Sequence, residues 1–149
     1  MKIYLGSDHR GFEKKGKIKK WLENKNYQLE DVGNLELDPK DDYPIFSERV
    51  GRSVVKNPGS LGVLLCGSGV GATAAANKID GVVAATGLSV TQVKAGRHDD
   101  DMNVLVLAAD EISLGEAKKM VKVFLKEKFG KEKRYERRLK QIEKLEDEN

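Results

Sequence analysis

Short runs with β-strand character alternate with amphipathic segments along the chain. The β-type runs lie at 2–7, 28–33, 61–67, 81–87 and 103–109. The segments between them carry helix-forming residues with apolar positions three and four apart, at 11–25, 44–56, 71–79, 89–97 and 113–129. Ile18, Trp21 and Leu22 are one example of this helical spacing. The pattern predicts strands that alternate with helices.

The last three β-type runs are apolar nearly throughout, whereas a strand with one solvated face would alternate. Such runs are typical of parallel strands that helices cover on both faces. The fold class is therefore predicted to be α/β, a three-layer α/β/α sandwich with a Rossmann-like, five-stranded parallel sheet and right-handed crossovers. We expect residues 1–149 to form a single domain, with an extended C-terminal helix at about 132–147.

Composition and charge exclude several classes of protein. The sequence has 39% hydrophobic and 34% charged residues, and 27 basic against 24 acidic residues give a net charge of +3. The terminal stretch 131–149 alternates in sign, as solvated helices do, so we expect no nucleic-acid partner. No apolar run approaches the roughly 20 residues that a membrane span needs, and the N-terminus lacks the features of a signal peptide. We therefore expect a cytoplasmic protein without a membrane partner.

Cys66 is the only cysteine, and the chain has two histidines. One cysteine cannot form an internal disulfide, and this set of side chains is a poor source of metal ligands. The composition predicts no metal site.

Ligands of parallel α/β sheets bind beyond the carboxyl ends of the strands. Three segments are candidates for this position: Asp8 and His9 after the first strand, Cys66 with the glycine-rich turn after the third, and residues 96–103, "GRHDDDMN", which run into the fifth. We expect the three segments to meet at one edge of the sheet.

The turn that follows Cys66 has the composition of an anion-binding loop. Glycines at 67, 69 and 71 allow a sharp bend that presents successive N–H groups, and an alanine-rich helix follows. These N–H groups and the helix start favour a phosphate or an enediolate oxyanion, and would lower the pKa of the neighbouring thiol. The loop lacks the terminal Gly-Lys-Ser/Thr of a Walker motif. It also does not follow the first strand, where a dinucleotide-binding fingerprint usually lies. Two interpretations of Cys66 stay open at this point: an inert, buried strand residue, or a catalytic thiolate.

Four sequence blocks together resemble the type B ribose-5-phosphate isomerases, a family that includes the galactose-6-phosphate isomerase subunits. The blocks are "GSDHRGFEKK" at 6–15, "DDYP" at 41–44, "GVLLCGSGVGATAAANK" at 62–78 and "RYERRLKQI" at 134–142. Their order and spacing agree with the family over almost the whole chain. The resemblance implies interconversion of an aldose phosphate and a ketose phosphate through a cis-enediolate, without metal or organic cofactor.

The resemblance also implies roles for individual residues. Cys66 would move the proton between C1 and C2 of the open sugar, and Asp8 would contact hydroxyls and help to open the furanose ring. The enediolate would be stabilised by Ser68 and by the N–H groups of Gly67, Gly69, Val70 and Gly71. The remaining substrate contacts would come from His9, Tyr43, Asn103, Arg134 and Arg138, the two arginines holding the phosphate from one face of the last helix. The family forms dimers or tetramers with shared sites, so the C-terminal helix is expected to pack on a partner subunit.

The sequence departs from the family pattern before the fifth strand. Counting back from Asn103 without a gap, Asp99 falls on the position of the ring-opening histidine, and His98 lies one residue early. Three alternatives follow: His98 reaches the site, Asp99 takes over the acid–base work, or ring opening is left to solvent and Asp8.

A second departure lies after the fifth strand, where Asp110 replaces an arginine that helps to hold the phosphate. Reversing a charge beside a dianion is not conservative. The basic residues that could compensate are Arg97, Arg137, Lys133 and Lys94. The departures leave two alternatives to a ribose-5-phosphate isomerase: an isomerase of another pentose or hexose phosphate, such as galactose 6-phosphate or allose 6-phosphate, and a weakened sugar-phosphate-binding homologue.

Overall fold

The computed structural model describes residues 1–149 and contains five strands and six helices. The strands are β1 (Lys2–Ser7), β2 (Gln28–Asp31), β3 (Leu61–Cys66), β4 (Ala84–Thr86) and β5 (Val104–Ala108). The helices are α1 (Phe12–Glu23), α2 (Tyr43–Lys56), α3 (Val70–Ala76), α4 (Val90–Asp100), α5 (Leu114–Lys126) and α6 (Lys133–Asp147). Each matches an element predicted from the sequence, and no boundary differs by more than three residues.

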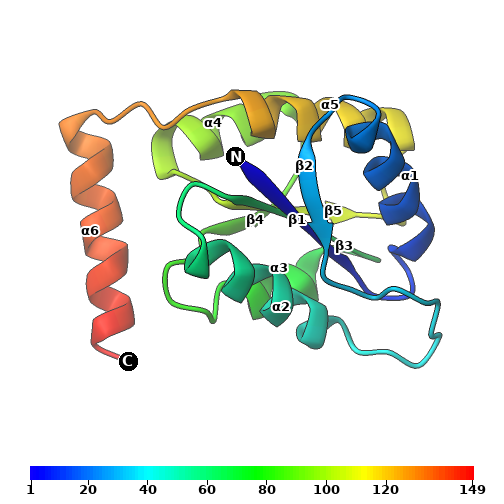
Figure 1. The fold of residues 1–149 in the computed structure, drawn as a ribbon. Helices are drawn as coiled ribbons and strands as arrows, with labels where there is room; N and C mark the ends of the chain where they lie inside the picture. The colour runs from blue at the N-terminus through cyan, green and yellow to red at the C-terminus, as the bar shows by residue number, and fades with distance from the viewer.

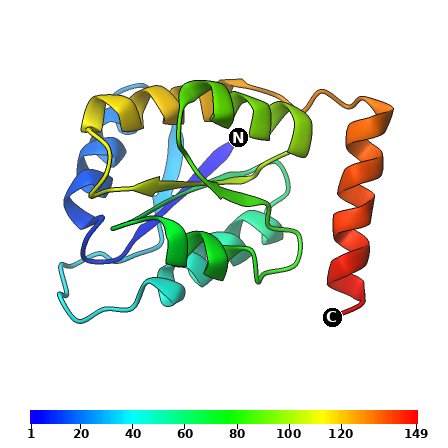
Figure 2. The same ribbon diagram turned by 180° about the vertical axis from the view of Figure 1, so that it is seen from behind.

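The strands form one sheet in the order β2-β1-β3-β5-β4, and every neighbouring pair is parallel. Helices α1, α4 and α5 cover one face, and α2 and α3 cover the other (Figures 1 and 2). Successive strand residues point to opposite faces. In β3, Val63 and Leu65 therefore join the core beneath α1, α4 and α5, whereas Leu64 and Cys66 join the core beneath α2 and α3. The predicted three-layer α/β/α fold is confirmed.

Two opposite edges of the sheet are distinguished by the direction of the parallel strands. We call the end at which the strands finish, after Ser7, Cys66 and Ala108, the carboxyl edge, and the end at which they begin the amino edge. At about 3.3 Å per residue, the two edges are separated by roughly 20 Å along a six-residue strand such as β3. This separation decides which predicted site residues meet within one chain.

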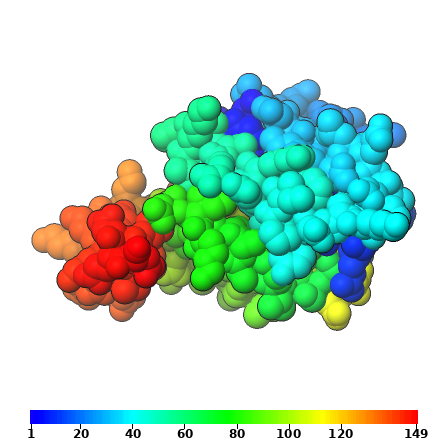
Figure 3. All heavy atoms as spheres, turned by 90° about the horizontal axis from the view of Figure 1, so that it is seen from below, coloured from blue at the N-terminus to red at the C-terminus, as the bar shows by residue number.

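Helix α6 stands beside the sandwich, past the amino edge, and does not cover either face of the sheet (Figures 1 and 2). In the space-filling view it forms a separate lobe next to the main body (Figure 3). Tyr135 anchors its first turn by burial, and the Gly81 N–H donates to Glu146 Oε1 at 2.9 Å near its end. Ile142 and Leu145 on this helix are exposed.

Candidate active site

Cys66 ends β3 at the carboxyl edge, and the glycine loop turns directly over its sulfur. The Gly69 N–H donates to Cys66 Sγ across 3.2 Å. Gly69 caps α3 with a φ of 79°, in the left-handed region where a side chain is disfavoured, and Thr86 leaves no room for a Cβ there. The loop conformation that brings an N–H to the sulfur therefore requires glycine at position 69.

The environment of Cys66 raises the pKa of its thiol. Burial is the main cause, since the side chain is 4% exposed and burial penalises the thiolate. The N–H groups of Ala72 and Gly69 act in the opposite direction, as the sequence predicted, and the charge of Arg10 does so too. The expectation of a lowered pKa was nevertheless wrong, because the strand that delivers Cys66 to the loop also places it in the core.

Asp8 and His9 follow β1 at the same edge. Asp8 is buried, and its Oδ1 accepts the N–H groups of Arg10 at 3.0 Å and Gly11 at 3.1 Å. His9 Nδ1 lies 2.7 Å from Asp41 Oδ1, which also accepts the His9 N–H at 2.9 Å. The hydrogen bond with Asp41 raises the pKa of His9, and it leaves Nε2 as the outward ring nitrogen.

The side chains of Tyr43 and Arg10 pack against glycines of the loop, which have no side chain of their own. The Tyr43 ring, at the start of α2, lies over Gly71, where a Cβ would come within 2.7 Å of Tyr43 Cε2. The Arg10 guanidinium lies in the same way against Gly67. Ser68 is exposed on the loop, and its Oγ accepts the Val70 N–H at 3.3 Å. The structure therefore gathers at the carboxyl edge the predicted residues Asp8, His9, Tyr43, Cys66, Gly67, Ser68, Gly69, Val70 and Gly71.

A second group of predicted residues gathers where α4 meets α6. His98 Nδ1 lies 2.8 Å from Asp99 Oδ1, and the His98 ring packs edge-on against Tyr135 with centroids 5.6 Å apart. Arg134 Nη2 donates to the Tyr135 hydroxyl at 3.0 Å. The hydrogen bond from His98 is the main cause that lowers the pKa of Asp99. Arg138 lies one turn beyond Arg134 on α6.

The expectation that residues 96–103 meet Cys66 at one edge was wrong within a single chain. Residues that run into a parallel strand lie at its beginning, so His98 and Asp99, at the end of α4, are at the amino edge. Asn103 lies there too, and its amide is already engaged, with Oδ1 accepting the Val83 N–H at 2.9 Å and Nδ2 donating to the Gly81 carbonyl at 2.8 Å. These bonds give Asn103 a role in holding the loop before β4.

Of the four basic residues expected to compensate for Asp110, Arg97 is excluded by its position. It is 9% exposed and donates to Asp101 Oδ1 at 2.9 Å and to the Met102 carbonyl at 2.7 Å. The sequence reasoning instead missed two residues. Asp41 fixes His9, and Arg10 pairs with Asp110 itself. Arg10 could have been predicted as a site residue from its position directly after Asp8 and His9, at the end of a strand.

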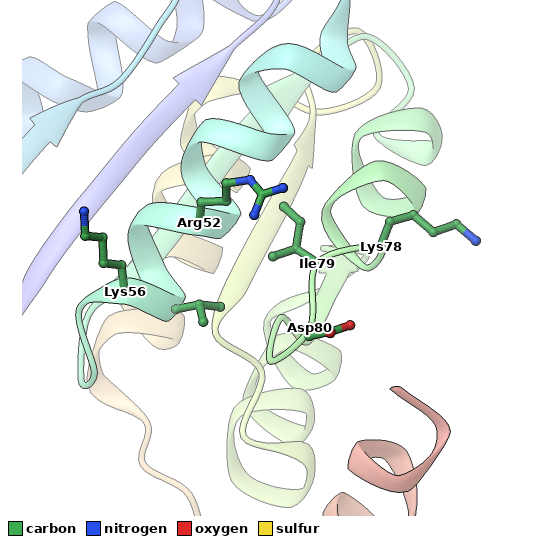
Figure 4. A pocket seen from close by; sticks show the side chains of 6 residues that line it. Arg52, Lys56, Lys78, Ile79 and Asp80 are labelled. Atoms are coloured by element: carbon green, nitrogen blue, oxygen red, sulfur yellow. The ribbon is translucent and has the colours of Figure 1, made fainter. Parts of the chain in front are cut away.

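Other parts of the surface lack the predicted site residues. A hollow of about 470 Å³ lies between α2 and the loop after α3, lined by Arg52, Val55, Lys56, Lys78, Ile79 and Asp80 (Figure 4).

No three His, Cys, Asp or Glu side chains gather as a possible set of metal ligands. None of the helices has the length and apolar character needed to cross a membrane. The cytoplasmic location stays a prediction.

Comparison with known proteins gives the family. The sequence model of the family described as "Ribose/Galactose Isomerase" matches residues 3–142. The chain belongs to this family. A relative from Mycoplasma pneumoniae, named "Probable ribose-5-phosphate isomerase B", is 42% identical over 127 residues, which cover 85% of this chain and 84% of the relative.

Solved structures of ribose/galactose isomerases share the whole fold. Ribose-5-phosphate isomerase B from Mycoplasma genitalium, with bound ribulose 5-phosphate, matches with a TM-score of 0.94 and 38% identity, over 99% of this chain and 97% of that one. The Clostridium thermocellum ribose-5-phosphate isomerase B matches with a TM-score of 0.95 and 32% identity, over 99% of both chains. Membership of the family confirms the resemblance found in the sequence and identifies the chain as an aldose–ketose isomerase.

Proposed function

We propose that this isomerase interconverts ribose 5-phosphate and ribulose 5-phosphate, with Cys66 as the base and no cofactor. The observation that carries the proposal is the position of Cys66: its sulfur ends β3, accepts the Gly69 N–H at 3.2 Å and shares the carboxyl edge with Asp8. The substrate is chosen because the similar proteins are named ribose-5-phosphate isomerase B and one of them holds ribulose 5-phosphate.

The reaction is an internal proton transfer. The Cys66 thiolate removes the proton from C2 of the open aldose, and the C2–H electron pair forms the C1–C2 double bond while the C1 carbonyl becomes an oxyanion. The Cys66 thiol then returns the proton to C1, and the proton of the O2 hydroxyl passes to the O1 oxyanion as the C2 carbonyl forms, so no external oxidant or reductant is required. We assign stabilisation of the oxyanion to Ser68 and to the N–H groups of the loop. The N–H groups in the first turn of α3, such as that of Gly71, have no acceptor within the helix and are available for this role.

Asp8 and His9 would hold the sugar at the same edge. The Asp8 carboxylate keeps Oδ2 free, since Oδ1 accepts both backbone N–H groups. Oδ2 is therefore suited to accept a sugar hydroxyl. His9 Nε2 points away from Asp41 at this edge, and the Tyr43 hydroxyl lies against Gly71 of the loop, so both are placed to contact the sugar.

The complete site would form between two subunits. Within one chain Cys66 and His98 lie at opposite edges of the sheet, so a substrate cannot touch both. Helix α6, which carries Arg134 and Arg138, stands beside its own sandwich rather than on a face of the sheet (Figure 3). We assign ring opening to His98 and Asp99, and phosphate binding to Arg134 and Arg138, of one subunit acting on the carboxyl edge of its partner. This arrangement makes the isomerase at least a homodimer.

Turnover of ribose 5-phosphate by the wild type and by Cys66→Ala tests the chemistry. We expect activity in the wild type and its loss in the variant, since general base catalysis contributes about 100- to 10,000-fold. Cys66→Ser is the matched variant, because it keeps the size of the side chain and removes the acidic thiol. Full activity in Cys66→Ala would refute the base assignment. Wild-type inactivity on ribose 5-phosphate, together with turnover of galactose 6-phosphate or allose 6-phosphate, would refute the substrate but keep the class.

Mixing two inactive variants tests the shared site. One variant carries Cys66→Ala and the other carries Arg134→Ala with Arg138→Ala, and the two are unfolded and refolded together. In a shared site, each mixed dimer has one intact site, so random pairing restores about one quarter of wild-type activity. Sites confined to one chain would restore none.

A further inference from the structure

Arg10 and Asp110 form an ion pair across the carboxyl edge, although they are 100 residues apart in sequence. Arg10 follows β1 and Asp110 follows β5, so the pair spans the end of β3, which lies between those strands. The Asp110 N–H donates to the Gly67 carbonyl at 3.1 Å. The pair therefore borders the loop that holds Cys66.

The Arg10 guanidinium rests on the bare α-carbon of Gly67. A methyl group at position 67 would overlap Cζ and Nε of Arg10, so glycine is what allows this contact. Nη2 donates to Asp110, while Nε and Nη1 make no hydrogen bond within the chain. Since the side chain is 52% exposed, these unused donors are open to a ligand beside the loop.

A guanidinium with free donors and a fixed plane is suited to an oxyanion that has several oxygens. Its donors match phosphate geometry, whereas a lysine would act as a point charge. His9 precedes Arg10 and presents Nε2 from the same strand end, with its cationic form favoured by Asp41. Two adjacent cationic donors thus lie at the same edge of the sheet as a loop whose N–H groups also favour an anion, and Arg10 contacts that loop directly.

We propose that Arg10 binds the phosphate group of the substrate and that Asp110 is the positioning residue that fixes the Arg10 guanidinium against Gly67. The identity of the substrate rests on the proposed function. The proposal explains how an acidic residue at position 110 is compatible with phosphate binding. The Asp110 carboxylate forms an ion pair with Arg10, which would lie between that carboxylate and the phosphate. The rival role is contact with the enediolate oxygens, and this would affect the reaction step more than binding.

Inorganic phosphate is the probe that separates the two roles. We expect Arg10→Ala to raise the inhibition constant of inorganic phosphate and the KM for ribose 5-phosphate together by about 10- to 100-fold, the range for a lost charge-assisted hydrogen bond. The value of kcat should change little, because a remote anchor stabilises ground state and transition state alike. A fall in kcat with an unchanged inhibition constant would overturn the proposal in favour of the enediolate role.

Further variants test the role of Asp110. Asp110→Asn should raise KM less than Arg10→Ala does, and the double variant Arg10→Ala/Asp110→Arg should recover part of the lost phosphate affinity by supplying a guanidinium from β5. Absence of any recovery, together with unchanged KM in Asp110→Asn, would refute the positioning role. Arg52→Ala is the matched control, since Arg52 also forms an ion pair, with Glu48 at 2.7 Å, but lies on α2 by the hollow of Figure 4.

Direct binding separates this inference from the proposed function. Calorimetric titration of wild type and Arg10→Ala with inorganic phosphate requires no turnover. Weaker binding in Arg10→Ala supports the inference even if ribose 5-phosphate is not converted, whereas equal binding refutes it even if the wild type is active. Arg10→Gln, which keeps the length of the side chain, replaces Arg10→Ala if the latter unfolds.

Discussion

His98 and Asp99 form one hydrogen-bonded pair, with Nδ1 of the imidazole 2.8 Å from Oδ1 of the carboxylate. The sequence offered these residues as alternatives for ring opening. In the structure a hydrogen bond joins the two side chains. A carboxylate that accepts from Nδ1 fixes the ring and favours proton exchange at Nε2. We therefore propose that His98 exchanges the proton and that Asp99 orients its ring.

The pair predicts an order of effects in the two directions of the reaction. His98→Asn should slow turnover of ribose 5-phosphate, which is mainly cyclic, by about 100-fold or more, the scale of general acid–base catalysis. Asp99→Asn should slow it less, because the imidazole survives. Ribulose 5-phosphate is open-chain, so kcat measured from that side should fall much less in both variants. A larger effect of Asp99→Asn would instead assign the proton transfer to Asp99.

The hydrogen bond between His9 and Asp41 predicts a shifted titration. It raises the pKa of His9 above the ordinary value of about 6.5. The pair therefore stabilises the fold fully below about pH 6.5 and loses this contribution as the pH rises through the folded-state pKa. Titration of the His9 ring protons by NMR should give a lower pKa in Asp41→Asn than in wild type. Asp38→Asn, an exposed aspartate of the same loop, is the control and should leave the His9 titration in place.

The buried thiol of Cys66 predicts activity that increases towards alkaline pH. Because burial raises its pKa, the free enzyme holds mostly the neutral thiol at pH 7. The value of kcat/KM should therefore rise with pH until the thiol ionises, above the ordinary range for cysteine. The rate of alkylation by iodoacetamide should follow the same curve, and in the unfolded chain it should reach its plateau at lower pH. A plateau in kcat/KM below pH 7 would argue against Cys66 as the titrating base.

The layers of the fold were predictable because they depend on local patterns. The continuous apolar run of β3 and the three-and-four spacing of Ile18, Trp21 and Leu22 indicate burial without knowledge of any distant contact. The place of Cys66 and Asp8 followed from the same pattern, since both come directly after a parallel strand.

The rest of the site depends on contacts that no local pattern encodes. The pairing of Arg10 with Asp110 requires the strand order, which places β1 and β5 on either side of β3. The position of His98 was misjudged because a segment before a parallel strand lies at the opposite edge from a segment after one. The pKa of Cys66 depends on a balance between burial and two N–H donors, and only the folded structure shows that burial has the larger effect.

The ion pairs of two lysines on α1 predict losses of stability of very different size for similar substitutions. Lys15 is 2% exposed, and its Nζ lies 2.9 Å from Asp31 Oδ1 and also donates to the Asn34 carbonyl, so it ties α1 to the loop that carries Asp41. Lys15→Met would leave the Asp31 carboxylate buried without its partner, and we expect a loss of about 3–5 kcal/mol in the free energy of unfolding. Lys17 and Glu13 form an exposed pair at 3.0 Å, which solvent screens, so Lys17→Met should change the free energy of unfolding far less.

Urea denaturation of both variants measures the contrast. Because Asn34 donates to Asp41 Oδ2 at 3.2 Å, and Asp41 holds His9, Lys15→Met should also raise the KM of the folded fraction, whereas Lys17→Met should not. Replacing both members of the buried pair, as Lys15→Met/Asp31→Leu, should recover part of the stability, because it removes the unpaired charge. If the single variant Lys15→Met were as stable as Lys17→Met, the buried pair would not be what holds the loop, and the position of His9 would have to depend on Asp41 alone.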